Sequence, residues 1–264
     1  MIIYICLVVL IGLIFGSFSS AFSYRFPRGI NFIKGRSFCD KCKTRISWYD
    51  NLPLLSFILL GGSCRACHKK ISLRYPLIEL AIASSFLLIF LVANSCGINS
   101  SPICLWKDSL DLLFYPFALF IFLLTELIFI IDLEKRIIPD ELVFIAIATT
   151  ALALIFINGD QFYLRLLTAT VAAFSLLSIH LATRGRGMGL GDVKFALLPG
   201  LFLGWPLALV WLFVAFLTGA IVAIILILLG RAKGKDKIAF GPFLALAFYL
   251  VTLYGNTFFK WLMP

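Results

Sequence analysis

The stretch FYPFALFIFLLTELIFIID, residues 114 to 132, decides the fold class of this chain. Its apolar part, Phe114 to Ile131, is long enough to cross a hydrocarbon core of ~30 Å as a helix. The stretch ends on a carboxylate, Asp132. Ionisable groups at membrane depth are costly, so a carboxylate at the edge of such a run is a candidate functional group.

Similar apolar runs fill most of the remaining chain. Hydrophobic residues make up 62% of the 264 positions and charged residues only 14%, whereas a soluble domain carries about 25% charged residues. Breakers at Gly204, Trp205 and Pro206 divide residues 195 to 229 into a short and a long helix. We therefore predict an all-α polytopic membrane protein with about eight transmembrane helices. The apolar runs fall at about 2 to 23, 77 to 94, 113 to 131, 141 to 158, 161 to 182, 195 to 204, 207 to 229 and 238 to 259.

The positions of Lys and Arg orient these helices. The segment 25 to 76 carries eleven of the 23 and three later loops carry nine more, whereas Lys107, Arg165 and Lys260 fall on the opposite side. Cytoplasmic loops are enriched in Lys and Arg, so both termini are expected outside the cytoplasm. The net charge of +10 is spread over loops rather than gathered in one patch, which argues against a nucleic-acid-binding protein. The first run lacks a basic n-region, so we interpret it as a retained helix.

The polar segment 25 to 76 contains two CxxC pairs, Cys39 with Cys42 and Cys64 with Cys67. Two such turns supply the four thiolates that tetrahedral Zn²⁺ prefers. A haem c attachment site at Cys64 to His68 and disulfide bonds both require an oxidising compartment. A redox CxxC would not need a second pair. We therefore predict a structural zinc site, and we expect Cys6, Cys96 and Cys104 to be packing residues.

A second carboxylate, Asp192, closes the glycine-rich stretch Gly187 to Asp192. With the predicted topology, Asp132 and Asp192 both reach the cytoplasmic membrane face. Two carboxylates that share a proton suit hydrolysis, because one activates water while the other polarises the scissile carbonyl. Glycines before Asp192, notably Gly189 and Gly191, would allow a substrate backbone to approach.

Other polar residues have simpler interpretations. Asp140, Glu134 and Glu141 suit charges at helix ends, although Glu134 and Asp140 are also candidates for reading a basic substrate. Glu126 fits an intramembrane pair as well as a functional acid. His180 fits a helix end, and the sequence from Phe240 to Phe243 fits a helix entry.

Several motifs together resemble the type IV prepilin peptidase family. They follow the family's order over most of the chain. The motifs are GSF at 16 to 18, YRFP at 24 to 27, the two CxxC pairs, DNLPLLSF at 50 to 57, ISLRYPLIEL at 71 to 80, IDLEKRIIPD at 131 to 140, GMGLGDVK at 187 to 194 and FGPFLALA at 240 to 247.

The resemblance implies a GxGD aspartic peptidase of the bacterial inner membrane. Such an enzyme removes the short basic leader of type IV prepilins or type II secretion pseudopilins at the cytoplasmic face. Asp132 and Asp192 match the catalytic pair, and Cys39, Cys42, Cys64 and Cys67 match the zinc ligands. Many members also N-methylate the new N-terminus with S-adenosylmethionine, an activity associated with the cysteine-bearing domain. The implied division is a helix at 1 to 24, a zinc-knuckle domain at 25 to 76 and a peptidase domain at 77 to 264.

Two other functions fit parts of the sequence. A zinc-containing membrane transporter or scaffold would use its aspartates to carry protons or ions, but would be expected to place charges deep within several helices. A general GxGD intramembrane protease would share the aspartates without needing the N-terminal motifs. Whichever function it has, the chain is expected to lie in a lipid bilayer and to bind no nucleic acid.

Overall fold

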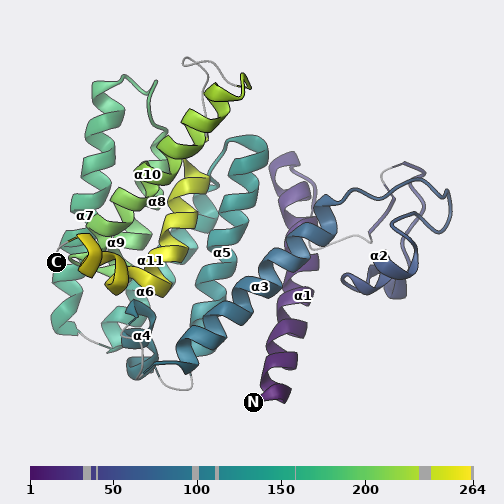
Figure 1. Cartoon of the computed structure of the whole chain (residues 1–264), viewed down its shortest axis with the longest axis horizontal. Helices are drawn as coiled ribbons and strands as arrows, with labels where there is room; N and C mark the ends of the chain where they lie inside the picture. The colour runs from purple at the N-terminus through teal and green to yellow at the C-terminus, as the bar shows by residue number, and fades with distance from the viewer. Residues whose placement is uncertain are drawn as a thin grey trace. The chain divides into compact units, whose positions relative to one another are not determined.

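The structure is a computed structural model, and it describes residues 1–31, 37–39, 41–96, 101–110, 113–157, 159–231 and 239–262. Helices dominate these residues, as predicted (Figure 1). The chain forms two compact units, Met1–Leu91 and Val92–Pro264. The helices are α1 (Ile2–Arg25), η1 (Phe26–Arg28), η2 (Trp48–Asn51), α2 (Leu55–Leu59), α3 (Arg74–Asn94), α4 (Pro102–Leu110), α5 (Phe114–Lys135), α6 (Asp140–Ile157), α7 (Gly159–Ala182), α8 (Leu190–Phe195), α9 (Leu197–Leu203), α10 (Leu207–Leu228) and α11 (Gly241–Leu262).

Six helices of the described residues are long and apolar enough to cross a membrane: α1, α3, α5, α7, α10 and α11. The predicted run 141 to 158 forms the 18-residue helix α6, whose two acids lie in its first turn. The predicted run 195 to 204 differs, because α9 has only seven residues. At 1.5 Å per residue such a helix covers about 11 Å, too little to cross the bilayer by itself. The predicted turn after it is confirmed, since Gly204 has a left-handed φ of 68°.

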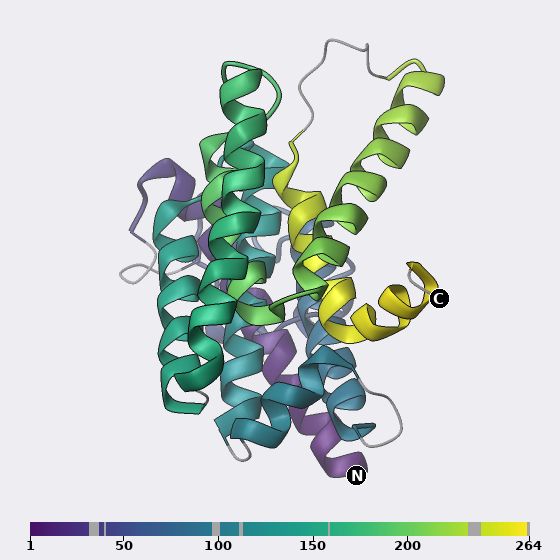
Figure 2. The ribbon, with the colours of Figure 1, turned by 90° about the vertical axis from the view of Figure 1, so that its left-hand side faces the viewer.

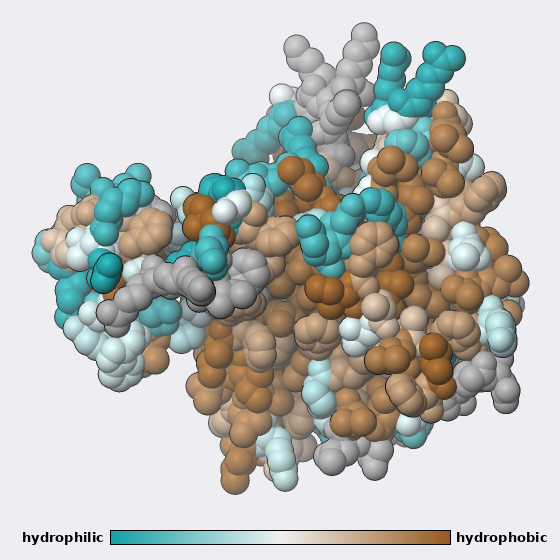
Figure 3. All heavy atoms as spheres, turned by 180° about the vertical axis from the view of Figure 1, so that it is seen from behind, coloured by the Kyte–Doolittle hydropathy of each residue, from teal (hydrophilic) through white to brown (hydrophobic). Residues whose placement is uncertain are grey.

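Large apolar side chains are exposed along several of these helices. Examples are Leu7 and Leu10 on α1, and Ile221 and Ile224 on α10. Figure 3 shows hydrophobic side chains over wide areas of the helices. Contiguous apolar surface of this extent is rare on soluble monomers, whereas a bilayer solvates it. This finding agrees with the predicted membrane protein.

The core of the second unit forms where α5, α9 and α11 meet. Phe122, Phe202 and Phe248 are fully buried, and their rings contact one another at centroid distances of 5.3 to 6.3 Å. On its other side, α9 packs tightly against α7, because a Cβ atom at Gly200 would overlap the backbone of Ala169. Figure 2 shows the helices of this unit from the side. The short α8–α9 segment is therefore held among longer helices.

The helix α4 and a disulfide bond were not anticipated from the sequence. Trp106 on α4 donates its indole N–H to the carbonyl of Phe202 at 3.0 Å, which ties α4 to the end of α9. Cys96 and Cys104 form a disulfide with Cα atoms 5.6 Å apart. The prediction that these two cysteines are packing residues was therefore wrong. Both cysteines lie on the predicted non-cytoplasmic side, where an oxidising compartment allows disulfides.

Candidate active site and metal centre

Asp132 lies in the last turn of α5 and is 4% exposed. The helix ends just after it, because Arg136 adopts a left-handed conformation and donates its N–H to the carbonyl of Asp132 at 2.8 Å. The Asp132 carboxylate accepts the backbone N–H of Gly241 at the start of α11, and the charge of Arg136 lies nearby. Both interactions stabilise the ionised carboxylate.

Gly241 is the residue at this site that sequence reasoning missed. A Cβ atom at this position would lie 2.5 Å from Oδ2 of Asp132 and 3.0 Å from Cδ1 of Ile138. Only a residue without a side chain allows α11 to begin against the carboxylate. The motif FGPF had been interpreted as a simple helix entry, whereas the structure places it in the first layer around Asp132.

Asp192 lies in the first turn of α8 and is 7% exposed. Its Oδ2 accepts the backbone N–H of Gly189 at 3.0 Å, the reciprocal half of a capping box. Burial raises the pKa of Asp192 to about 6; the Gly189 hydrogen bond opposes this shift, and the charge of Asp132 adds to it. Ile138 links the surroundings of the two acids. A Cβ atom at Gly241 would lie near both Oδ2 of Asp132 and Cδ1 of Ile138, and a Cβ atom at Gly191, the residue before Asp192, would lie 2.9 Å from Cβ of Ile138. The structure therefore places Asp132 and Asp192 on opposite sides of Ile138.

The glycine-rich loop before Asp192 is anchored to the end of α7. Nδ1 of His180 is 2.7 Å from the carbonyl oxygen of Met188. The N–H of Gly187 donates to the hydroxyl of Thr183 at 3.1 Å. His180 is a helix-end residue, as predicted, and it also holds the loop that carries Asp192.

The side chain of Ile138 lies beside Gly191, where a substrate backbone was predicted to approach. A Cβ atom at Gly191 would lie 2.9 Å from Cβ of Ile138. The need for glycine at this position is therefore explained by packing against the loop between α5 and α6. At Gly189, in contrast, the nearest neighbour of a Cβ atom would be Oδ2 of Asp192 at 3.3 Å.

The remaining candidate acids lie at the surface of this site. Asp140 begins α6 and forms an ion pair with Lys194 at 2.6 Å. This pair joins the segment after Asp132 to the helix that carries Asp192. Glu134 is exposed in the last turn of α5.

The four predicted metal ligands converge in the first unit. Their sulfur atoms all lie within 4.8 Å of one another, and Sγ of Cys39 is 3.9 Å from Sγ of Cys67. Sulfur ligands at 2.3 Å from a tetrahedral Zn²⁺ are separated by about 3.8 Å, so the set fits zinc.

Both metal-binding turns have the same backbone structure. The N–H groups of Cys39 and Cys64 donate to the carbonyls of Thr44 and Lys69, each at 3.0 Å. The residue that follows each second cysteine, Lys43 or His68, has a positive φ of 61° or 55°. Each turn therefore presents two thiols toward the same point.

The thiols differ in acidity. Hydrogen bonds from Thr44 lower the pKa of Cys42 to about 6. At Cys67 a hydrogen bond from Lys69 lowers the pKa, but desolvation and the neighbouring thiols outweigh it and raise the pKa to about 11. Four adjacent thiolates repel one another, so this cluster is suited to a bound cation.

Comparison with known proteins agrees with this arrangement. Residues 10–93 match the bacterial peptidase A24 N-terminal domain, and residues 117–224 match the type IV leader peptidase family. A prepilin leader peptidase/N-methyltransferase of Aeromonas salmonicida is 32% identical over 240 residues, which cover 88% of this chain and 75% of the relative. The protein of the same name from Bacillus subtilis is 30% identical, over 93% of this chain and 92% of the relative.

A third relative with this name, from Vibrio cholerae, is 33% identical over 76% of this chain and 78% of its own length. No solved structure shows significant similarity to this chain. The membrane-spanning helices and the two buried aspartates, Asp132 and Asp192, define the class: a polytopic membrane protein with a candidate aspartate site. This chain belongs to the type IV leader peptidase family.

Proposed function

We propose that this chain cleaves the basic leader from type IV prepilins or type II secretion pseudopilins, with Asp132 and Asp192 as its catalytic pair. The observation that carries the proposal is the convergence of two buried carboxylates from α5 and α8, each with a backbone N–H donor. The names of the relatives support the substrate class.

The environments of the two acids suggest their roles. Asp192 holds the shared proton, because its pKa is raised to about 6 by burial and further by the charge of Asp132. We assign Asp132 as the ionised partner: burial opposes its charge, but the backbone N–H of Gly241 and the nearby charge of Arg136 both act to stabilise it. Asp132 then removes a proton from the attacking water, while Asp192 donates a hydrogen bond to the carbonyl oxygen of the scissile peptide.

Substrate binding follows from the same geometry. The extended backbone approaches at Gly189, where a side chain would crowd Asp192. Exposed Glu134 attracts the basic leader. Asp140, which forms an ion pair with Lys194, is the second candidate for reading the leader's charge. Gly191 supports the site through packing against Ile138.

The N-terminal unit supplies the second activity, N-methylation of the newly exposed amine with S-adenosylmethionine as the methyl donor. Cys39, Cys42, Cys64 and Cys67 would hold a structural Zn²⁺ that stabilises the knuckle domain, residues 25 to 76. The functional boundary at residue 77 is a prediction of the sequence, whereas the packing unit extends through α3 to Leu91.

The catalytic face is cytoplasmic, and the protein resides in the bacterial inner membrane. The distribution of Lys and Arg supports this orientation. The Cys96–Cys104 disulfide supports it independently, because its loop is assigned to the opposite, oxidising side.

The proposal is tested with purified, zinc-loaded protein and a synthetic prepilin that carries a basic leader, a Gly-Phe junction and the following apolar segment. Mass spectrometry is expected to show cleavage at the junction. The new N-terminus should also gain about 14 Da, because methylation replaces one hydrogen with a methyl group. A protein that transports ions or protons would leave the peptide intact. A general protease would also cut a matched peptide without the basic leader.

A further inference from the structure

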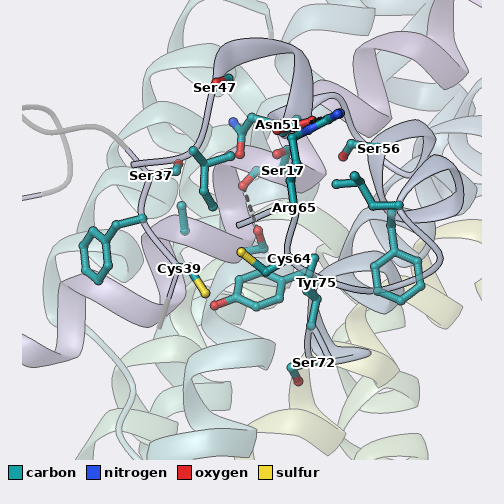
Figure 4. A pocket seen from close by; sticks show the side chains of 18 of the residues that line it. Ser17, Ser37, Cys39, Ser47, Asn51, Ser56, Cys64, Arg65, Ser72 and Tyr75 are labelled. Carbon is teal, nitrogen blue, oxygen red and sulfur yellow. Dashed lines mark hydrogen bonds and ion pairs between the residues drawn. The ribbon is translucent and has the colours of Figure 1, made fainter. Parts of the chain in front are cut away.

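The second unit contains a cavity of about 330 Å³ that is separate from the aspartate site. It lies where the start of α7, the turn between α9 and α10 and the last part of α11 meet, with Leu105 of α4 at its edge. It also differs from the cavity of the first unit, which is lined partly by Cys39 and Cys64 (Figure 4). Its volume falls at the lower end of the range of about 300 to 1,000 Å³ that is usual for small-molecule sites. Neither proposed activity uses the described residues that line it.

The polar residues of this cavity lie at the level of the lipid headgroups. The membrane span of α7 begins at Gln161, and that of α11 ends at Trp261. Arg165 and Asn256 lie within the first and last turns or so of these spans, about 6 to 8 Å from their ends at 1.5 Å per residue. Trp205, which also lines the cavity, is 61% exposed, and Trp is enriched at membrane–water interfaces. The cavity therefore opens at the edge of the bilayer, on the side predicted to be non-cytoplasmic.

Arg165 brings a permanent positive charge into this cavity. Its Nη1 donates to the carbonyls of Leu201 and Phe202 at 3.3 and 2.7 Å, and its Cζ lies 5.4 Å from the ring centroid of Trp106. These contacts fix the side chain, but a guanidinium has five N–H donors, so Nε and Nη2 can still donate to an anion. Among the described side chains no carboxylate pairs with it. A cation at membrane depth is costly unless an anion compensates it.

The rest of the lining suits the other parts of a phospholipid. Gln161 lies one turn before Arg165 on the same face of α7, and Asn256 adds a second amide. Amides can donate hydrogen bonds to phosphate and glycerol oxygens. Leu105 and Leu164 are 58% and 56% exposed at the cavity edge, so they offer apolar surface to acyl chains that remain in the bilayer.

We propose that this cavity binds an anionic phospholipid of the non-cytoplasmic leaflet, with the lipid phosphate against Nε and Nη2 of Arg165. The planar guanidinium matches the geometry of a phosphate, and the phosphate supplies the missing counter-charge. A zwitterionic lipid fits less well, because its headgroup cation would lie close to Arg165. Because Arg165 also holds the carbonyls at the end of α9, the bound lipid stabilises the folded protein. The proposal does not depend on the peptidase or methylation activities.

Lipid binding is tested with the full-length, zinc-loaded protein in dodecylmaltoside micelles. Energy transfer from tryptophan to pyrene-labelled phosphatidylglycerol is titrated, and pyrene-labelled phosphatidylcholine with the same acyl chains is the zwitterionic comparison. Phosphatidylglycerol should reach half-saturation at a concentration at least about tenfold lower, as expected for charge-assisted hydrogen bonds. Equal half-saturation by the two lipids overturns the proposal. Displacement of phosphatidylglycerol by an equal concentration of inorganic phosphate also overturns it, because free phosphate would then be the ligand.

The location is tested with Gln161→Glu, which places a carboxylate one turn from Arg165. This carboxylate would supply the counter-charge from within the chain and repel the lipid phosphate, while an acid in the first turn of a helix favours folding. The preference for phosphatidylglycerol should fall by at least about tenfold. Ser109→Glu is the matched control: it adds the same charge at an exposed position on α4, outside the lining, and should keep the wild-type preference. An undiminished preference in Gln161→Glu overturns the location.

Melting temperature provides a second measurement. Phosphatidylglycerol should raise the melting temperature of wild type and of Ser109→Glu above the value in phosphatidylcholine, because a ligand of the folded state stabilises it. It should not raise that of Gln161→Glu. A cooperative melting transition reports that each variant is folded. Equal melting temperatures of wild type in the two lipids, or an unchanged shift in Gln161→Glu, contradict the proposal, whereas a failure of wild type to cleave prepilin contradicts only the proposed function.

Discussion

Gly241→Ala is expected to inactivate the peptidase without unfolding it. The new Cβ atom would lie 2.5 Å from Oδ2 of Asp132, whereas carbon and oxygen normally approach to about 3.3 Å or more. The carboxylate or the start of α11 must therefore move by about 0.8 Å. The movement also weakens the hydrogen bond from the Gly241 N–H to the charged carboxylate, an interaction worth about 1.5 to 3 kcal/mol.

A misplacement of about 1 Å can lower a catalytic rate about 100-fold, and we expect a loss of kcat/KM of that order. The assay follows cleavage of the synthetic prepilin by mass spectrometry over a range of substrate concentrations. Gly255→Ala is the matched control on the same helix, because its Cβ atom would meet side-chain carbons of Val251, Leu207 and Pro102 at 3.0 to 3.2 Å and no atom of the aspartate site. Cleavage by folded Gly241→Ala within threefold of wild type would refute the placement of Asp132 against α11.

Three further predictions concern the packing, the proton and the metal. Gly191→Val should lower both cleavage and the melting temperature, because its side chain meets Cβ of Ile138; a loss of cleavage with unchanged melting would restore the idea that substrate approaches Gly191. Cleavage should fall about tenfold per pH unit above the Asp192 pKa of about 6, because the proton that polarises the carbonyl is then lost; a rate that rises steadily from pH 6 to 8 would contradict this role. Metal analysis should find one Zn²⁺ per chain and little in a Cys64→Ser, Cys67→Ser double variant, since zinc ligation supplies folding free energy of order 10 kcal/mol; full zinc in the double variant would exclude the thiolate site.

The membrane fold could be predicted because apolar length is a property of the local sequence. The long helices α1, α3, α5, α10 and α11 follow from it directly. The short helices α8 and α9 do not, because their length is set by packing partners such as Ala169 beside Gly200. The helix α4 escaped prediction since Lys107 and Asp108 make it too polar for a membrane span.

The candidate site was predictable where chemistry constrains the residue type. The four cysteines converge as their spacing indicated, and both aspartates are buried close to Ile138. Gly241 and Ile138 were missed because their roles depend on contacts between segments far apart in the chain. The Cys96–Cys104 bond could have been predicted from the topology, because the non-cytoplasmic side of the membrane permits disulfides. The prediction used this difference between compartments only for the four cytoplasmic cysteines.

The catalytic pair itself is tested most directly by Asp132→Asn and Asp192→Asn, singly and combined, with the synthetic prepilin as substrate. Each single variant should show no detectable cleavage, and the double variant should be no worse, because residues that act as a unit are not additive. All three should still insert into the membrane, bind zinc and methylate a pre-cleaved peptide. Substantial leader removal by either single variant would contradict the assignment of these two carboxylates as the catalytic pair.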